Sequence, residues 1–355
     1  MRTKVIKINP NYIDEKSIKE AGKVLLEGGL VALPTETVYG LGANALNADS
    51  SKKTYEVKGR PSDNPLIIHI AKIEDLDKIV VNKSEKSMLL ADKFWPGPLT
   101  VIFEKSPLVP YGTTGGLESV AVRMPKGSIA LAIIEAGGGF VSAPSANISG
   151  RPSPTTAAHV IEDLDGKIEM IIDGGAVEIG LESTVIDMTS TPPTILRPGA
   201  ITPKMIEEII GTVKVEKGIL PDDSAEKPKA PGTKYRHYAP KGEMYIVKGD
   251  LEQEILEIQK LVKIKLEENK TVGVIATAET YARYKNGVVK NIGSRGDMNT
   301  IAENLYKVIR EFDEEDVEII FSESLPLDGI GEAIMNRLDK AAGGKYIQVS
   351  SGKTI

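Results

Sequence analysis

Two cations share a short loop with small polar residues in the segment KGRPSDN, residues 58–64. Lys58 and Arg60 flank Gly59, and Ser62 and Asn64 follow them. A guanidinium presents a planar fork to phosphate oxygens and an ammonium a mobile point charge, so the combination suits triphosphate binding. An isolated K-G-R-P is as often only a solvated helix end followed by a turn. Two cations, a hydroxyl and an amide crowded beside a strand favour phosphate binding, and we expect neither cation to lie in the core.

A second polar segment, SAPSANISG at residues 142–150, follows an apolar strand. Ser145 and Asn147 lie within it and Ser153 follows. Small residues at a strand end often form no more than a tight turn. However, α/β folds bind ligands beyond the carboxyl ends of their strands, so these neutral hydrogen-bonding groups are candidate ligand contacts.

Two arginines lie in otherwise apolar runs. Arg123 belongs to VAVRM and Arg197 to ILRPGAI. A buried arginine usually requires an anionic partner. That partner is either a structural carboxylate of the protein or a carboxylate of the ligand, and the sequence leaves both open.

Familiar cofactor motifs are absent or incomplete in this sequence. Gly40, Gly42 and Ala45 fit a dinucleotide-binding pattern, but about twenty residues later the only acid is Asp63 in a Pro-rich loop, so we discount it. There is no P-loop sequence and no H-E-x-x-H. The three histidines, His69, His159 and His237, are far apart, so we expect no protein metal ligands. Mg²⁺ held by phosphates would leave no such signature.

The pattern of apolar residues predicts two α/β domains that position these groups. Residues 1–211 alternate short strands with amphipathic helices at irregular spacing, which favours a twisted mixed sheet. Residues 212–242 are rich in Pro, Gly, Lys and Asp and read as a long linker, whose end, APGTKYRHYAP, could act as a lid. Residues 243–355 show strict strand–helix alternation, which predicts a smaller parallel sheet with Rossmann-like winding.

Composition narrows the class of protein. The chain has 355 residues, no cysteine and a net charge of −6, and residues 1–211 carry 22 Lys and Arg against 26 Asp and Glu. Such a balance argues against binding nucleic acid mainly through its phosphate backbone. The absence of cysteine excludes disulfides and thiolate zinc sites. We find no membrane span and no export signal, and therefore expect a cytoplasmic protein.

Taken together, these segments resemble the YrdC-type threonylcarbamoyl-AMP synthases in their long, two-domain form. The similar segments are PTETVYGLG, KGRPSDNPLIIHI, WPGPLT, VAVRMP, SAPSANISGRPSPT, LESTVID, LRPGAI, APGTKYRHYAP and GIGEAIMNRLDKA. They run nearly from end to end of the chain. The resemblance implies a YrdC-like catalytic domain, a lid-forming linker and a C-terminal Rossmann-like domain.

The resemblance also implies an activity and site residues. Family members join L-threonine, bicarbonate and ATP into threonylcarbamoyl-AMP and release pyrophosphate, with Mg²⁺ accompanying ATP. The product serves a downstream tRNA threonylcarbamoyl transferase machinery; weak contact with tRNA is left open. The resemblance gives Lys58, Arg60, Ser145 and Asn147 as catalytic residues. ATP would contact those four and Asn64, Ser119, Ser153, Arg197 and Tyr235, and threonine would contact Thr35 or Thr37, His69, Arg123, Ala143 and Ser183.

The implied chemistry agrees with the residue types. The threonine amine forms a carbamate whose oxygen attacks the α-phosphate of ATP, so positioning and charge neutralisation suffice and no protein nucleophile is required. Two alternatives remain. One is an RNA-binding module that uses the same cations on a concave surface, which the acidic balance and the lack of an aromatic platform disfavour. The other is a carbamoyltransferase of the hydrogenase-maturation type, which normally carries cysteine-rich zinc motifs.

Overall fold

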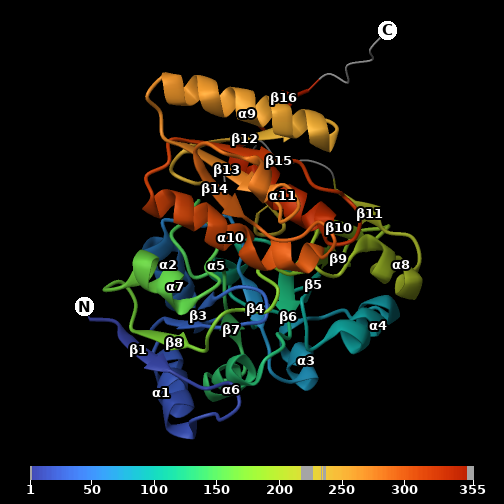
Figure 1. The fold of residues 1–355 in the computed structure, drawn as a ribbon. Coiled ribbons are helices and arrows are strands. Elements are labelled where there is room, and N and C mark those ends of the chain that lie inside the picture. Colours follow the sequence, from blue (N-terminus) through green and yellow to red (C-terminus); the bar gives the residue numbers. More distant parts are fainter. Residues whose placement is uncertain (1, 217–226, 233, 235–236, 350–355) are drawn as a thin grey trace. The chain divides into compact units, whose positions relative to one another are not determined.

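The computed structural model describes residues 2–216, 227–232, 234 and 237–349 (Figure 1). The chain divides into two compact units. The N-terminal unit comprises residues 1–149 and 153–235, and the C-terminal unit comprises residues 150–152 and 236–355. The first part of the predicted linker therefore groups with the N-terminal unit.

The described part of the N-terminal unit contains one 11-stranded mixed sheet, in the order β1-β8-β2-β3-β7-β4-β6-β5-β9-β10-β11. Parallel and antiparallel pairs alternate irregularly, as the irregular spacing of the strands predicted. The strands are β1 Lys4–Lys7, β2 Val31–Leu33, β3 Gly40–Asn44, β4 Ile67–His69, β5 Leu99–Glu104, β6 Ser119–Arg123, β7 Val141–Ser142, β8 Met170–Asp173, β9 Thr184–Asp187, β10 Thr194–Arg197 and β11 Lys214–Val215.

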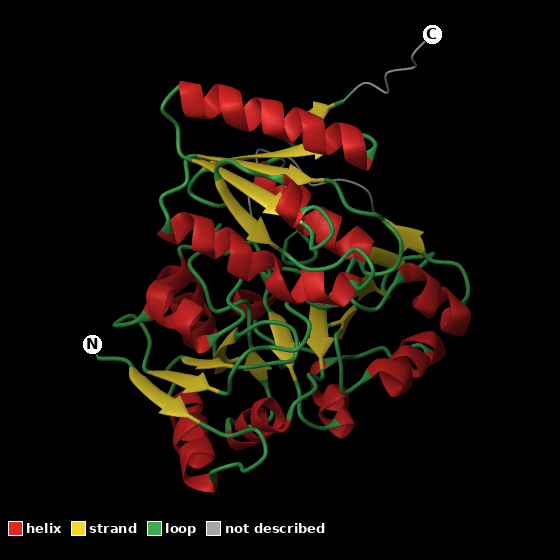
Figure 2. Ribbon diagram, in the orientation of Figure 1, coloured by secondary structure: helices red, strands yellow, loops and turns green. Residues whose placement is uncertain are grey.

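Helices cover both faces of this sheet (Figure 2). Val31 and Leu33 pack with residues of α1 and α6 on one face, whereas Leu30 and Ala32 pack with residues of α7 on the other. Because side chains alternate along a strand, β2 is apolar on both faces and reads as a continuous apolar run. The helices are α1 Glu15–Leu26, α2 Ala48–Lys58, α3 Leu76–Ile79, α4 Glu85–Phe94, α5 Tyr111–Thr114, α6 Ser128–Ala136, α7 Ala157–Leu164 and α8 Pro203–Ile210, with the 3₁₀ turn η1 at Ile73–Asp75.

The C-terminal unit contains a five-stranded, fully parallel sheet in the order β14-β13-β15-β12-β16 within the described residues. Helix α9 lies on one face and α10 and α11 lie on the other (Figure 1). Right-handed crossovers require this arrangement, because the connection through α9 runs along the sheet in the opposite direction to the connections through α10 and α11. The elements are β12 Glu243–Lys248, α9 Leu251–Glu267, β13 Val272–Ala276, η2 Tyr281–Arg283, β14 Val288–Asn291, α10 Met298–Glu314, β15 Ile319–Glu323, α11 Gly331–Ala342 and β16 Tyr346–Gln348.

The structure confirms the predicted fold class and adds detail that the sequence did not reveal. Segment 40–44, which fits a glycine pattern in the sequence, is strand β3, the fourth of the eleven strands in the large sheet. Segment 48–58 is helix α2, which the sequence analysis did not predict because its amphipathic pattern is weak. Strict strand–helix alternation fails once, because β13 and β14 are joined by the short 3₁₀ turn η2.

Candidate functional site

Lys58 brings the two predicted polar segments together. It is the last residue of α2, which ends at Gly59 in the left-handed conformation with φ 60°. The Lys58 ammonium donates to the backbone carbonyls of Ser145 and Asn147 and lies 3.3 Å from Asn147 Oδ1. The Ser149 amide in turn donates to the Lys58 carbonyl at 2.8 Å. The lysine and the Ser-Ala-Asn segment therefore form one hydrogen-bonded unit.

Lys58 and Arg60 are both buried, which contradicts the expectation that neither cation lies in the core. Lys58 is 2% exposed, and Arg60 is 8% exposed. The physical reason is that the polar loops supply acceptors inside the protein, so a cation can be buried with hydrogen bonds. Burial lowers the pKa of Lys58 well below its usual value, and the charge of Arg60 lowers it further, whereas Asp163 opposes both effects. A bound anion would oppose them in the same way as Asp163.

Arg60 organises its own loop. Its Nε donates to the Asn64 carbonyl at 3.2 Å, and its Nη2 donates to Asn64 Oδ1 at 2.6 Å and to the Pro65 carbonyl at 3.1 Å. Three bonds to residues four and five positions later fix the turn between α2 and β4. Arg60 and Asn64, predicted to bind the same ligand, are thus in direct contact.

His69 and Arg123 end two neighbouring strands. They face each other in the register of the parallel pair β4 and β6 and are both buried. Arg123 Nη1 donates to Thr37 Oγ1 at 2.9 Å, and Thr37 Oγ1 lies 2.9 Å from Thr35 Oγ1. The predicted threonine-binding residues therefore converge on the carboxyl ends of these strands, where α/β folds place ligands.

His69 is electrically neutral in this environment. Burial is the main cause that lowers its pKa to about 3, and the Arg123 charge adds to the effect. Its Nδ1 lies 3.2 Å from the Ile67 carbonyl. At neutral pH the imidazole can act only as a neutral hydrogen-bonding group.

Glu36 is a residue that our sequence prediction missed. Its carboxylate oxygen Oε2 lies 2.7 Å from Arg123 Nη2, and both side chains are buried. This answers the question that the sequence left open, since Arg123 does have a structural carboxylate beside it. The available signal was the acid inside PTETVYG, which stands between two threonines.

Ser183 and Arg197 form a further contact pair. Arg197 Nε donates to the Ser183 carbonyl at 3.0 Å, and Nη2 donates to Ser183 Oγ at 3.2 Å. The preceding residue, Glu182, accepts a 2.5 Å hydrogen bond from Ser153. The predicted threonine-binding Ser183 and the predicted nucleotide-binding Ser153 and Arg197 thus meet around residues 182 and 183. Glu182 is a second residue whose role we did not predict.

The remaining predicted site residues are Ala143, Ser119 and Tyr235. Ala143 is buried at the end of β7, and its amide donates to the Ile67 carbonyl at 3.0 Å. Ser119 opens β6, the strand that Arg123 ends, so the two side chains lie about 13 Å apart along it. Tyr235 lies outside the described residues.

Described residues of the predicted linker contact the N-terminal unit. Arg197 Nη1 donates to the Pro231 carbonyl at 3.2 Å, Lys229 pairs with Asp187 at 2.9 Å, and Lys234 lies 3.7 Å from Asp63. Lys229, Pro231 and Lys234 therefore attach this segment at points next to Arg197 and next to the Arg60 loop.

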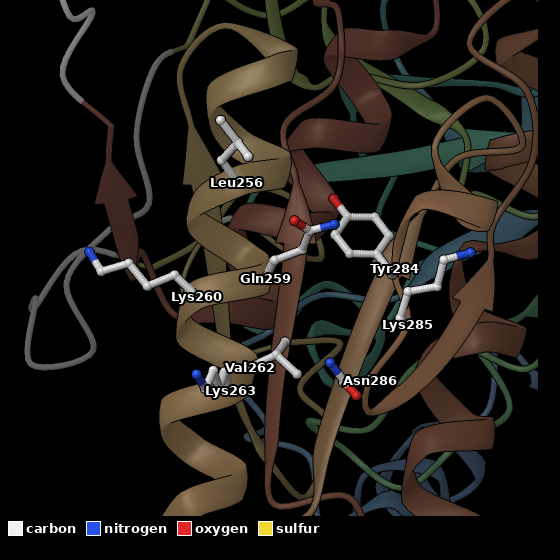
Figure 3. A pocket seen from close by; sticks show the side chains of 8 residues that line it. All are labelled: Leu256, Gln259, Lys260, Val262, Lys263, Tyr284, Lys285 and Asn286. Atoms are coloured by element: carbon white, nitrogen blue, oxygen red, sulfur yellow. The ribbon is translucent and has the colours of Figure 1, made fainter.

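The C-terminal unit has a pocket of its own, of about 430 Å³, between α9 and the segment after η2 (Figure 3). Figure 3 shows Lys260, Lys263 and Lys285 around it, with Val262 and the Tyr284 ring at its wall. Lys260 is partnered by Glu257, and Lys285 donates to the Ala282 carbonyl. The lining residues include no carboxylate, histidine or hydroxyl nucleophile arranged for catalysis.

The donor set around the N-terminal site suits a metal that arrives with its substrate. Within the described residues no group of three or more His, Asp or Glu side chains could hold an ion. Mg²⁺ bound through phosphate and water oxygens needs few protein ligands, so it would leave no such group.

Comparison with known proteins agrees with this fold and site. One family model, described as telomere recombination, matches residues 23–199, and another, described as the C-terminal domain of threonylcarbamoyl-AMP synthase, matches residues 201–343. A threonylcarbamoyl-AMP synthase of Pyrococcus abyssi is 48% identical, with 95% of this chain and 97% of the relative covered. The enzyme of that name from Bacillus subtilis is 49% identical, with 94% and 95% covered.

A solved structure is similar over the same extent. The crystal structure of P. abyssi Sua5 complexed with L-threonine matches with a TM-score of 0.91 and 47% identity, covering 98% of this chain and 100% of that one. The fold and the polar N-terminal site define a YrdC-like α/β protein with an added parallel-sheet unit. The chain belongs to the family of threonylcarbamoyl-AMP synthases, in its two-domain form. Among the helices that the structure describes, none combines the length and the apolar character needed to cross a membrane.

Proposed function

We propose that this protein makes threonylcarbamoyl-AMP and pyrophosphate from L-threonine, bicarbonate or CO₂, and ATP. The observation that carries the proposal is the unit formed by Lys58, Ser145 and Asn147, because it joins a cation of one predicted polar segment to both predicted residues of the other by hydrogen bonds. Support also comes from relatives of that name, which match over nearly the whole chain.

Catalysis in this proposal rests on position and charge. Lys58 and Arg60 stabilise negative charge on the triphosphate and on the departing pyrophosphate, and Mg²⁺ bound to the phosphates supplies further positive charge. Ser145, Asn147, Ser153 and Arg197 hold the nucleotide. Arg123 forms two bonds to the threonine carboxylate, while Thr35, Thr37 and Ser183 contact its hydroxyl end.

The product is a reactive acyl-adenylate, which a water-filled site would hydrolyse. Residues 229–234 already contact the N-terminal unit beside Arg197 and Asp63. We propose that the rest of the segment, including Tyr235, closes over the nucleotide when it binds. The product then passes to a tRNA threonylcarbamoyl transferase machinery, and we expect the protein in the cytosol, where tRNA is modified.

The test is pyrophosphate release from ATP and bicarbonate with each amino acid in turn. We expect release with L-threonine and little with serine or valine. Tight binding of double-stranded RNA without pyrophosphate release would favour the RNA-binding module. Turnover of carbamoyl phosphate in place of threonine and bicarbonate would favour the carbamoyltransferase.

A further inference from the structure

Glu36 is a buried carboxylate that the described structure pairs with Arg123, yet neither of its oxygens accepts a hydrogen bond there. It lies on the loop after β2, between Thr35 and Thr37, and its side chain is 3% exposed. Neither carboxylate oxygen has a hydrogen-bond partner, and neither has Arg123 Nη2, although Nη2 lies 2.7 Å from Oε2. Buried polar groups are almost always hydrogen-bonded, and leaving a charged one unpaired is unfavourable. The pair therefore keeps bonding capacity that the protein itself does not use.

An α-amino acid has the complementary groups. Its carboxylate matches the guanidinium of Arg123, and its ammonium matches the carboxylate of Glu36. The two charges of the zwitterion are separated by only two bonds around one carbon, and the two protein charges are likewise adjacent. Arg123 Nε and Nη1 already donate to Gly97 and Thr37, which fixes the plane of the guanidinium. Nη2, which has its ion pair with Glu36 but no hydrogen bond, thus marks where a ligand carboxylate would bind.

Carbamate formation needs an amine that has lost its proton. The groups around Arg123 offer few proton acceptors. His69 is a poor one, because its pKa is lowered to about 3. Glu182, beside Ser183, already accepts a hydrogen bond from Ser153. The hydroxyls of Thr35 and Thr37 bond to each other.

We propose that Glu36 binds the α-ammonium group of L-threonine and accepts its proton, a role that rests on the function proposed above. The N–H bond breaks and the proton moves to a Glu36 oxygen, leaving the electron pair on nitrogen. That pair forms the N–C bond to CO₂ while one C–O π pair moves onto oxygen, and the second ammonium proton leaves to water as the carbamate forms. Glu36 returns its proton to solvent after the product departs.

The experiment compares two ligands that differ only in the amine. Calorimetry measures binding of L-threonine and of (R)-3-hydroxybutanoate, which keeps the carboxylate and hydroxyl, to the wild type and to Glu36→Gln. We expect Glu36→Gln to weaken L-threonine binding about 10-fold or more, as for loss of a hydrogen bond to a charged group, and not to weaken the analogue. Pyrophosphate release at saturating L-threonine should fall about 10²-fold, a typical contribution of a general base.

Two further variants keep the result interpretable. Glu15→Gln removes an exposed glutamate of the same unit, which pairs with Lys19, and should change neither affinity. Glu36→Asp keeps the charge on a shorter side chain and replaces Glu36→Gln if that variant melts below the assay temperature; it should lose L-threonine affinity selectively too. Equal losses for both ligands would mean that Glu36 only positions Arg123 and would overturn the proposal. A wild type that does not bind L-threonine would instead contradict the proposed function.

Discussion

Replacing Lys58 with methionine tests the centre of the proposed site. The substitution keeps the length of the side chain and removes the donor that serves the Ser145 and Asn147 carbonyls. Each buried carbonyl left unpaired destabilises the fold by about 1–3 kcal/mol. Removing the ammonium also removes an unfavourable burial, which is visible in its lowered pKa. We therefore expect a net loss of about 1–3 kcal/mol, which lowers Tm by about 3–10 °C for a unit of this size.

Activity should fall much further than stability. Removal of a group that stabilises transition-state charge typically lowers turnover by about 10²-fold or more. Pyrophosphate release is measured well below the Tm of the variant, where the protein is folded, so the rate reports the effect on catalysis separately from the effect on folding. Lys52→Met, on the same helix but exposed and paired only with Glu56, is the matched control and should leave both quantities unchanged. A Lys58→Met protein that melts lower yet turns over at the wild-type rate would refute the phosphate role and leave Lys58 a structural residue.

Three further outcomes are expected. Arg123→Lys should weaken L-threonine binding much more than ATP binding in calorimetry, because lysine cannot form a two-bond fork; equal losses would assign Arg123 to structure. His69 should make the fold acid-sensitive, because its folded pKa of about 3 lies below the unfolded value. The free energy of unfolding should therefore decrease as pH falls from about 6.5 toward 3. His69→Gln should reduce this dependence on pH in urea unfolding measured at several pH values. Trypsin cleavage after Lys234 or Arg236 should slow when ATP and L-threonine are added together, and truncation after Gly211 should impair product formation; unchanged cleavage together with full activity of the truncated chain would make the segment a simple tether.

The fold class followed from the sequence because alternation and length are local signals. Runs such as 30–33 are apolar at every position, which is typical of a strand covered on both faces, and the structure buries that strand between two helical layers. Strand β3 was not predicted as a strand because three of its five residues are Gly or Ala, which have no strand preference. It is placed by its neighbours β2 and β7, which is information that a local pattern does not contain.

The candidate site was predictable in its residue types but not in its contacts. The cations and small polar residues are visible in the sequence, whereas their partners are distant in it: Lys58 meets Ser145 from 87 positions away and Arg123 meets Thr37 from 86. The same limitation explains why Lys58 was placed outside the core. Burial of a lysine depends on acceptors supplied by another loop, and no local pattern shows them.

Lys58 and Glu36 share a physical property that links the two ends of the proposed site. Each is a buried charge that the protein satisfies incompletely: the pKa of Lys58 is lowered by burial, and Glu36 has an ion pair with Arg123 but no hydrogen bond to either oxygen. In each case the missing charge is one that a substrate carries, the phosphate of ATP for Lys58 and the ammonium of threonine for Glu36. Phosphate binding would therefore raise the pKa of Lys58, and ATP should bind with proton uptake at pH values between the lowered pKa of the free protein and the raised pKa of the complex. Binding of a substrate with the opposite charge offsets the unfavourable burial of these groups in the free protein. A ligand without that charge therefore binds more weakly.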